Sequence, residues 1–232
     1  MEIMEIMKDA LVYPLNNIKA LVVYIILGTI LGAAVIGTIT IFAMDNSLAS
    51  IGFGIVGIII TILIAFVISG YELDIVKYGI ERNPSAPGID IVRQFTNGVK
   101  LLAITLAYFS SLIFISVCLV ILFPHWISTV IIALLILIFA LPTFMAHCRF
   151  AKTEDLGYAL AMGEAIGDIS RVGTEKLFLF IIAIVIVVLI LYFIVTLIAQ
   201  WNQTAGGTLM GILGVYITFF TGRAAGLLYS DV

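Results

Sequence analysis

The sequence predicts an all-α membrane protein with six transmembrane helices, arranged as three hairpins. Three observations lead to this prediction. Of the 232 residues, 63% are hydrophobic and 11% are charged, against roughly 45–50% and about 25% in soluble proteins. The apolar residues fall in runs of about 20, the length that a helix needs to cross a ~30 Å hydrocarbon core. Every Lys and Arg lies near the same end of these runs, as counted below.

The apolar runs define one membrane domain, residues 1–232. The expected spans are 20–44, 51–70, 101–123, 126–146, 177–200 and 207–228. The last span is the weakest prediction because Arg223 interrupts it. Membrane strands would alternate apolar and polar residues, whereas 181–195 is apolar at every position. We therefore expect helices.

The charged residues predict the orientation. The connections after the first, third and fifth spans contain only Asp45 and His125 as ionisable groups, so all eleven Lys and Arg lie on the other side. The basic side of a membrane protein faces the cytoplasm. We expect a multi-pass protein of the cell (plasma) membrane with N- and C-termini in the cytoplasm. The net charge of −3 excludes a polybasic protein that binds nucleic acid.

The segments that enter the odd-numbered spans resemble one another. Asp9, Asp90 and Asp168 are spaced by 81 and 78 residues, and a Lys follows each of them just before the span. Such a period predicts three copies of one unit, an amphipathic helix followed by a hairpin. The alternative is that any Lys before an apolar run looks alike. Interfacial helices are expected at 3–18, 71–82, 90–99 and 154–172, with the three Asp as N-caps or first-turn acids.

Catalysis and metal binding find little support. No ionisable residue lies in the middle of a span, which argues against a proton-coupled transporter, an ion pump or an intramembrane hydrolase. Arg223 either snorkels to phosphates or has a functional role. His147 and Cys148 are adjacent, but two further ligands for a metal are missing. We expect a protein that is not an enzyme, with no cofactor and no metal.

The best candidate ligand site lies between the third and fourth spans, near Tyr108, Ser110, Ser111, Pro142 and Thr143, with Arg223 as a further candidate. Pro142 frees a backbone carbonyl, which nearby hydroxyls commonly satisfy. One interpretation is therefore hydroxyl–backbone bonding within a packed bundle. The other is a kinked, mildly polar cavity that is open to a lipid headgroup or an amphiphile.

Glycine pairs at i and i+4 let helices approach closely in lipid. Three such pairs predict helix packing: Gly28 and Gly32, Gly207 and Gly211, Gly222 and Gly226.

Three segments together carry a family resemblance: 70–73 with the loop 83–87, the entry segment 90–102, and Leu141-Pro142 leading to 149–151. They resemble a family of six-span archaeal membrane proteins, common in methanogens, that is catalogued as domain of unknown function 4013. Similar hairpins occur in bacterial membrane families, including the membrane part attached to some glycerophosphodiester phosphodiesterases. The resemblance implies a role close to lipids and supplies no functional residues.

Two functions are therefore expected. The first is a non-enzymatic membrane protein that binds or moves a lipid or another apolar ligand, with membrane lipids as partners and anionic headgroups near the basic residues. The alternative is a scaffold or accessory subunit that docks a cytosolic or membrane partner, or forms a homo-oligomer.

Overall fold

The computed structural model describes residues 1–44, 48–201 and 203–232, and within these ranges the regular structure is helical, without a strand. The helices are α1 (Ile3–Asn16), α2 (Ile18–Met44), α3 (Leu48–Ile80), α4 (Ile91–Leu122), α5 (His125–Thr153), α6 (Leu156–Leu160), α7 (Met162–Val172), α8 (Thr174–Trp201) and α9 (Gln203–Tyr229). Six of them, namely α2, α3, α4, α5, α8 and α9, are long and apolar enough to cross a membrane. The prediction of an all-α chain with six such helices is confirmed, and it characterises a multi-pass membrane protein.

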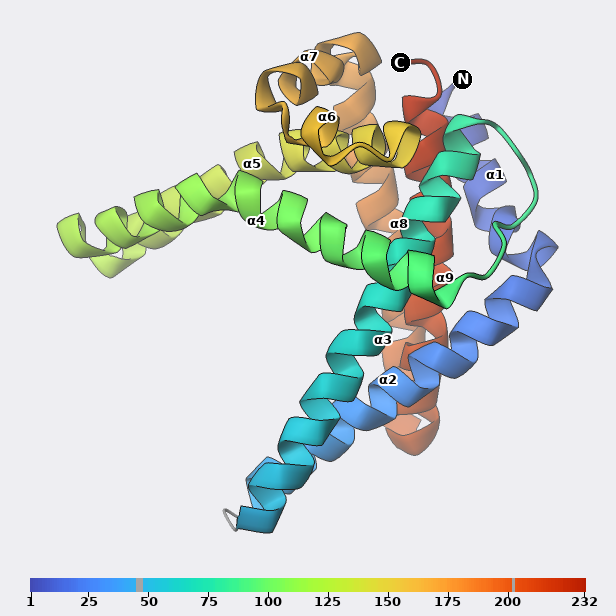
Figure 1. Ribbon diagram of the computed structural model, residues 1–232, viewed down its shortest axis with the longest axis vertical. Coiled ribbons are helices and arrows are strands. Elements are labelled where there is room, and N and C mark those ends of the chain that lie inside the picture. The colour runs from blue at the N-terminus through green and yellow to red at the C-terminus, as the bar shows by residue number, and fades with distance from the viewer. Residues whose placement is uncertain (45–47, 202) are drawn as a thin grey trace.

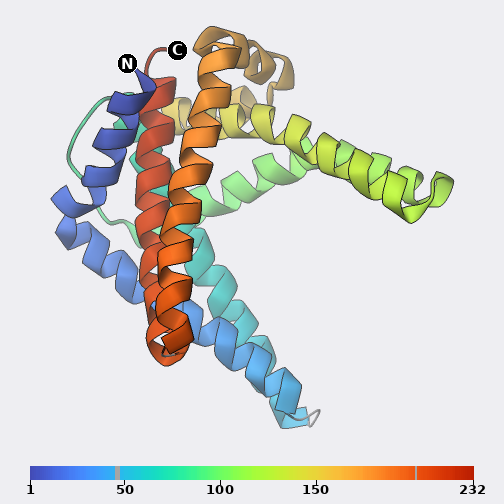
Figure 2. The ribbon, with the colours of Figure 1, turned by 180° about the vertical axis from the view of Figure 1, so that it is seen from behind.

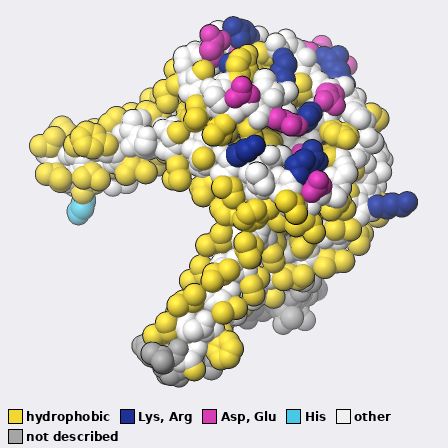
Figure 3. Space-filling view, viewed as in Figure 1, with side chains coloured by type: hydrophobic (Ala, Val, Ile, Leu, Met, Phe, Trp, Pro, Cys, Tyr) yellow, Lys and Arg dark blue, Asp and Glu magenta, His cyan; other side chains and the backbone are white. Residues whose placement is uncertain are grey.

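Three hairpins spread from one end of the molecule (Figures 1 and 2). We call them arms: α2–α3, α4–α5 and α8–α9. The α4–α5 arm diverges widely from the other two (Figure 1). We call the end where they meet the hub, which also contains α1, α6, α7 and the loop 81–90. Charged side chains gather on the hub, whereas the arms present hydrophobic side chains (Figure 3).

The arms are apolar on their outer surfaces. Phe114 in α4, Leu137 in α5 and Phe193 in α8 are among the large hydrophobic side chains that are more than 60% exposed. In water such surfaces would be costly, at roughly 25 cal/mol per Å² of apolar area. A helix that is hydrophobic all round is typical of a membrane span, so lipid is the environment that suits these surfaces.

Two expected interfacial helices are instead parts of longer helices. Helix α3 continues without a break to Ile80, so most of the segment 71–82 extends the second span. Helix α4 begins at Ile91, so the segment 90–99 leads directly into the third span. A change from apolar to polar residues does not by itself end a helix. A proline would end or kink it, and neither α3 nor α4 contains one. The prediction of separate interfacial helices at 71–82 and 90–99 is therefore wrong.

The other two expected interfacial segments do form separate helices at the hub. Residues 3–18 contain α1, and residues 154–172 contain α6 and α7. The N-cap prediction for the three acidic residues is confirmed for Asp90 and wrong for Asp9 and Asp168. Asp90 is the N-cap of α4, where its side chain accepts a hydrogen bond from the Arg93 N–H. Asp9 and Asp168 lie inside α1 and α7, so they are not caps.

A fully buried ion pair fastens α7 to α5. The Arg149 guanidinium donates to Asp168 at 2.8 Å, and both side chains are 0% exposed. Asp168 also accepts from the Tyr229 hydroxyl and from Arg171. Burial opposes ionisation of Asp168, but these donors outweigh it and hold the pKa of the carboxyl below its usual value. Arg149 in turn stacks on the Tyr158 ring, 3.9 Å from its centroid.

The other two entry segments are also held by ion pairs, but in each of these only one partner is buried. Asp9 of α1 pairs with Arg223 of α9 at 2.7 Å, and Arg93 of α4 pairs with Asp74 of α3 at 2.9 Å. Each entry segment thus pairs with the second helix of an arm that it does not lead into. The start of α4 pairs with α3 and α7 pairs with α5, each in the preceding arm, whereas α1 pairs with α9 of the last arm. The three arms are linked to one another at the hub by these pairs.

Glycines allow the arms to cross at the hub. A Cβ atom on Gly70 of α3 would lie 2.8 Å from the Cα of Gln94, and one on Gly98 of α4 would lie 2.8 Å from the Cα of Phe66. Backbone therefore meets backbone where α3 and α4 cross, as small residues permit in membrane helices.

Three of the glycines predicted for packing contact another helix. A Cβ on Gly28 of α2 would lie 2.5 Å from Val215 of α9, and one on Gly226 of α9 would lie 2.7 Å from the Cα of Gly79 in α3. A Cβ on Gly222 would lie 3.2 Å from Glu72. These positions require a small residue.

Close contact with another helix is not seen at the other three glycines predicted for packing, as far as the structure describes them. A Cβ on Gly211 would be 3.8 Å from the Gly28 carbonyl, which is ordinary contact. One on Gly32 would meet nothing within 4 Å, so the packing role predicted for Gly32 is not found among the residues that the structure describes. The surroundings of Gly207 lie outside the described residues.

Candidate functional site

A cavity of about 320 Å³ lies among five helices near the hub ends of the arms. Its size is within the range of ~300–1,000 Å³ that is typical of ligand pockets. Most of the lining is apolar, with side chains from α3, α4, α5, α8 and α9. The polar lining side chains are Glu72, His147, Cys148 and Thr221, and the apolar ones include Phe144, Phe180, Ile181 and Ile184.

Helices α3 and α9 place a carboxylate and a hydroxyl together in the lining. The Thr221 hydroxyl of α9 lies 3.2 Å from Glu72 Oε1 of α3 and 2.8 Å from the carbonyl of Ile217, and either oxygen can accept its single hydrogen. The close passage of the two helices at Gly222 and Gly226 positions them. A side chain at Gly222 would push against the Cγ of Glu72, so this glycine leaves the space that the carboxylate arm occupies.

Helix α5 contributes an imidazole. His147 Nε2 lies 3.0 Å from the Thr105 hydroxyl of α4. Thr105 has one hydroxyl hydrogen, and the carbonyl of Leu101, one turn earlier, accepts it at 2.9 Å. When Thr105 donates to Leu101, the Nε2 of a neutral His147 ring is the protonated nitrogen that donates to Thr105, and Nδ1 is left as an acceptor.

Glu72 is half-buried, and it differs from the two buried acidic side chains of the hub. Asp74 and Asp168 are each paired with an arginine. Across the described part of the chain, Glu72 forms no ion pair with Lys, Arg or His, and Thr221 is its hydrogen-bond donor. A buried carboxylate without a cation is costly. The cavity wall thus contains one half-buried acidic group that forms no ion pair with a described Lys, Arg or His.

The predicted residues of α4 lie outside this cavity. Ser110 and Ser111 are exposed on the arm, and the Ser110 hydroxyl donates to the carbonyl of Ala107. Tyr108 is buried, and its hydroxyl donates to the carbonyl of Ala159 at the start of the hub segment. Tyr108 thus connects α4 to α6. Tyr108, Ser110 and Ser111 do not line the cavity.

Pro142 and Thr143 are buried in α5 but do not line the cavity either. The Thr143 hydroxyl donates to the carbonyl of Phe139, one turn earlier, at 2.7 Å. This is a hydroxyl–backbone bond within the helix, but the carbonyl that Pro142 frees is that of Ile138, one residue earlier. Helix α5 remains a single helix through Pro142.

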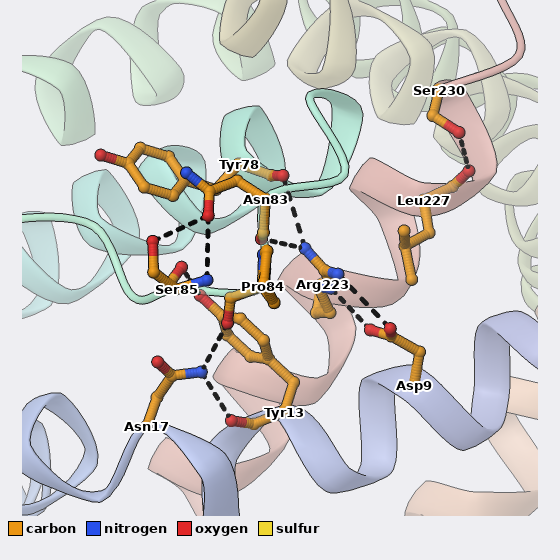
Figure 4. Close-up of polar contacts among 10 residues, drawn as sticks. All are labelled: Asp9, Tyr13, Asn17, Tyr78, Asn83, Pro84, Ser85, Arg223, Leu227 and Ser230. Carbon is orange, nitrogen blue, oxygen red and sulfur yellow. Dashed lines mark hydrogen bonds and ion pairs between the residues drawn. The ribbon is translucent and has the colours of Figure 1, made fainter.

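Arg223 is held inside the hub (Figure 4). It is 2% exposed, it pairs with Asp9, and it donates to the carbonyls of Asn83 at 2.6 Å and Tyr78 at 3.4 Å. Its guanidinium also lies 5.0 Å from the centroid of the Tyr13 ring. The snorkelling predicted for Arg223 is therefore wrong, because its donors are used on the protein and none reaches the surface. The Tyr13 side chain is itself buried, and this burial raises the pKa of its hydroxyl to about 12.

Sequence reasoning missed Glu72, Thr221 and the cavity role of His147. One signal was present for Glu72. No basic residue stands three or four positions before or after it, where a helix would place an ion-pair partner. The convergence of residues 72, 147, 181 and 221 depends on tertiary structure, which no local pattern indicates.

A comparison with known families decides the classification. The family model described as "Protein of unknown function (DUF4013)" matches residues 53–200, more than half of the chain. The chain belongs to the DUF4013 family. The matched segment of this DUF4013 protein contains Glu72, His147, Phe180 and Ile181, whereas Thr221 and Ala225 lie beyond it. No curated protein and no solved structure matches the chain.

Proposed function

We propose that this DUF4013 protein binds an amphiphile, a lipid or a lipid-like molecule, in the cavity between α3, α5, α8 and α9. The observation that carries the proposal is the composition of the cavity wall. Phe144, Phe180, Ile181 and Ile184 form an apolar region suited to an alkyl chain, and Glu72 and Thr221 form a polar one suited to a head group. A mostly apolar pocket with a few polar groups is the usual form of a small-molecule site.

The proposal is of a binding protein and not of an enzyme. Because the cavity is lined by helices of all three arms, an occupant would contact each arm. Binding or movement of an amphiphile within the membrane is the activity that this placement supports.

The test is native mass spectrometry of the protein released from its own membrane. Ala225 lines the cavity and is buried, so Ala225→Phe would fill part of the cavity. Ala133→Phe is the matched control, because Ala133 is exposed on α5. The wild-type protein and Ala133→Phe should carry a discrete amphiphile adduct that Ala225→Phe lacks. If Ala225→Phe does not fold, Ile184→Phe replaces it. An adduct retained by a folded cavity variant, or absent from the wild type, would contradict the proposal.

The scaffold function is the second candidate, and one observation favours it. A groove of about 710 Å³ runs along α2 and α9 and is lined by Gly28, Gly32, Gly211, Gly214 and other small or aliphatic residues. Such a surface could receive a helix of a partner or a second copy. In that case Gly32→Leu would abolish a co-purifying protein or an oligomer, and the amphiphile adduct would remain.

We further infer that the hub faces the cytoplasm of an archaeal cell, with the arms in its plasma membrane. All Lys and Arg lie towards this end, and the basic side of membrane proteins is cytoplasmic. We also infer that the three arms are copies of one ancestral unit. The supporting observation is that each entry segment pairs with the second helix of an arm, through Asp9, Arg93 and Asp168.

A further inference from the structure

The polar groups of the cavity are mostly hydrogen-bond acceptors. An ionised Glu72 accepts only. Thr221 directs its single hydrogen to Glu72 or to the carbonyl of Ile217. His147 uses its Nε2–H on Thr105, which leaves Nδ1 as an acceptor. The thiol of Cys148 is the remaining polar lining group, and it is a weak donor.

Positive charge is absent from the described lining. The residues that line the cavity include no Lys and no Arg. Three arginines of the hub form ion pairs with other carboxylates: Arg149 with Asp168, Arg223 with Asp9 and Arg93 with Asp74. A phosphate or a carboxylate of a ligand would therefore meet Glu72 without a compensating cation.

A ligand cation would remove this imbalance. Burying a carboxylate is costly unless it is paired and hydrogen-bonded, and a charged donor makes hydrogen bonds roughly twice as strong as a neutral one. A primary ammonium group carries one positive charge and three N–H donors. It could satisfy the free oxygen of Glu72 and a second acceptor of the lining at the same time.

We infer that the head group recognised by this cavity is a protonated amine, bound by Glu72, and that its alkyl chain lies against Phe144, Phe180 and Ile184. The inference rests on the proposed function, since it assigns the chemical class of the amphiphile. It differs from the expectation of an anionic headgroup, which the basic residues of the hub suggested. The same amine could belong to a two-chain membrane lipid or to a single-chain amphiphile, and the mass of the native adduct distinguishes these sources.

The test uses three probes with the same ten-carbon chain: decylamine, decanol and decanoate. Each is titrated into the purified full-length protein in a neutral detergent, with adducts counted by native mass spectrometry. The variants are Glu72→Gln and, as a matched control, Glu154→Gln, whose carboxylate is 48% exposed and pairs with Lys77. Ala225→Phe tests occupancy of the cavity itself.

The wild type and Glu154→Gln should bind decylamine at least tenfold more tightly than decanol or decanoate. Glu72→Gln should lose this preference but still bind decanol. Equal affinity of wild type and Glu72→Gln for decylamine would overturn the assignment of the amine. In that event, loss of decanol binding in Ala225→Phe would leave the proposed function intact. If Ala225→Phe binds all three probes as the wild type does, both the amphiphile site and the amine head group are contradicted. Both are also contradicted if the wild type binds none of the probes.

Discussion

Replacement of Asp168 by Asn perturbs the most deeply buried ion pair of the hub. Asp168 and Arg149 are both fully buried, and Arg149 Nη2 already lacks a hydrogen-bond partner. The substitution leaves the Arg149 guanidinium without its carboxylate and turns an amide N–H₂ either towards Arg171 or towards Arg149 and Tyr229, all of which are donors. Breaking a buried pair by removing one partner costs about 3–5 kcal/mol. At roughly 2–4 °C per kcal/mol for a chain of 150–250 residues, the melting temperature should fall by about 6–20 °C.

The assay is thermal unfolding in a neutral detergent at pH 7, followed by circular dichroism and by loss of the monodisperse peak in gel filtration. Glu154→Gln is the control, because its pair with Lys77 is exposed and such pairs contribute about 0–1 kcal/mol. If Asp168→Asn melts within 2 °C of Glu154→Gln, as roughly expected for a loss below 1 kcal/mol, the pair does not fasten α7 to α5 and the description of the hub is incorrect.

Three further predictions follow from the same contacts. Because the pKa of Asp168 is lowered in the folded protein, its stabilisation should be complete above the unfolded value of about 3.9 and lost as pH falls through the folded value. The difference in melting temperature between wild type and Asp168→Asn should therefore be constant from about pH 5 to 8 and shrink below about pH 4; a difference unchanged at pH 3 would be evidence against the lowered value. Gly98→Ala should destabilise the protein by about 1–3 kcal/mol through overpacking, whereas Gly32→Ala, with open space around it, should be neutral or stabilising by up to about 1 kcal/mol; equal melting of these two variants would contradict the crossing of α3 and α4. The double substitution of Ser110 and Ser111 by Leu should leave the amphiphile adduct unchanged, because both side chains lie outside the cavity; its loss in native mass spectrometry would return the site to the third and fourth spans.

The six helices were predictable because membrane crossing imposes a length and a composition that local sequence displays. The run 181–195 is apolar at every position, and only a helix surrounded by lipid or protein suits it. The gathering of charge on the hub was equally predictable from the placement of Lys and Arg. The length of α3 was not, because the polarity change at Tyr71 and Glu72 suggested a boundary that the backbone does not have.

The candidate site was beyond local pattern. Ser110 and Ser111 were predicted as ligand-binding residues because of their hydroxyl groups. A serine in a membrane helix can instead donate to a backbone carbonyl of its own helix, as Ser110 does to Ala107, and then needs no ligand. One of the two expectations for Arg223 was snorkelling to phosphates, and its pairing with Asp9 was not predictable because the two residues are distant in the sequence. The crossing at Gly70 and Gly98 decides how the α2–α3 and α4–α5 arms meet. Neither glycine belongs to one of the i, i+4 pairs from which packing was predicted.

Photoaffinity labelling tests the central claim, which is that an amphiphile occupies the cavity with its amine at Glu72. The probe is a decylamine with a diazirine in the middle of its chain, irradiated with the full-length protein in a neutral detergent and mapped by peptide mass spectrometry. Labels should fall on the lining residues Phe180, Ile181, Ile184 and Val185 of α8 and Phe144, His147 and Cys148 of α5, and excess decylamine should remove them. Labels confined to the groove around Gly32 and Gly214, or spread evenly along the outer surfaces of the arms, would contradict the account.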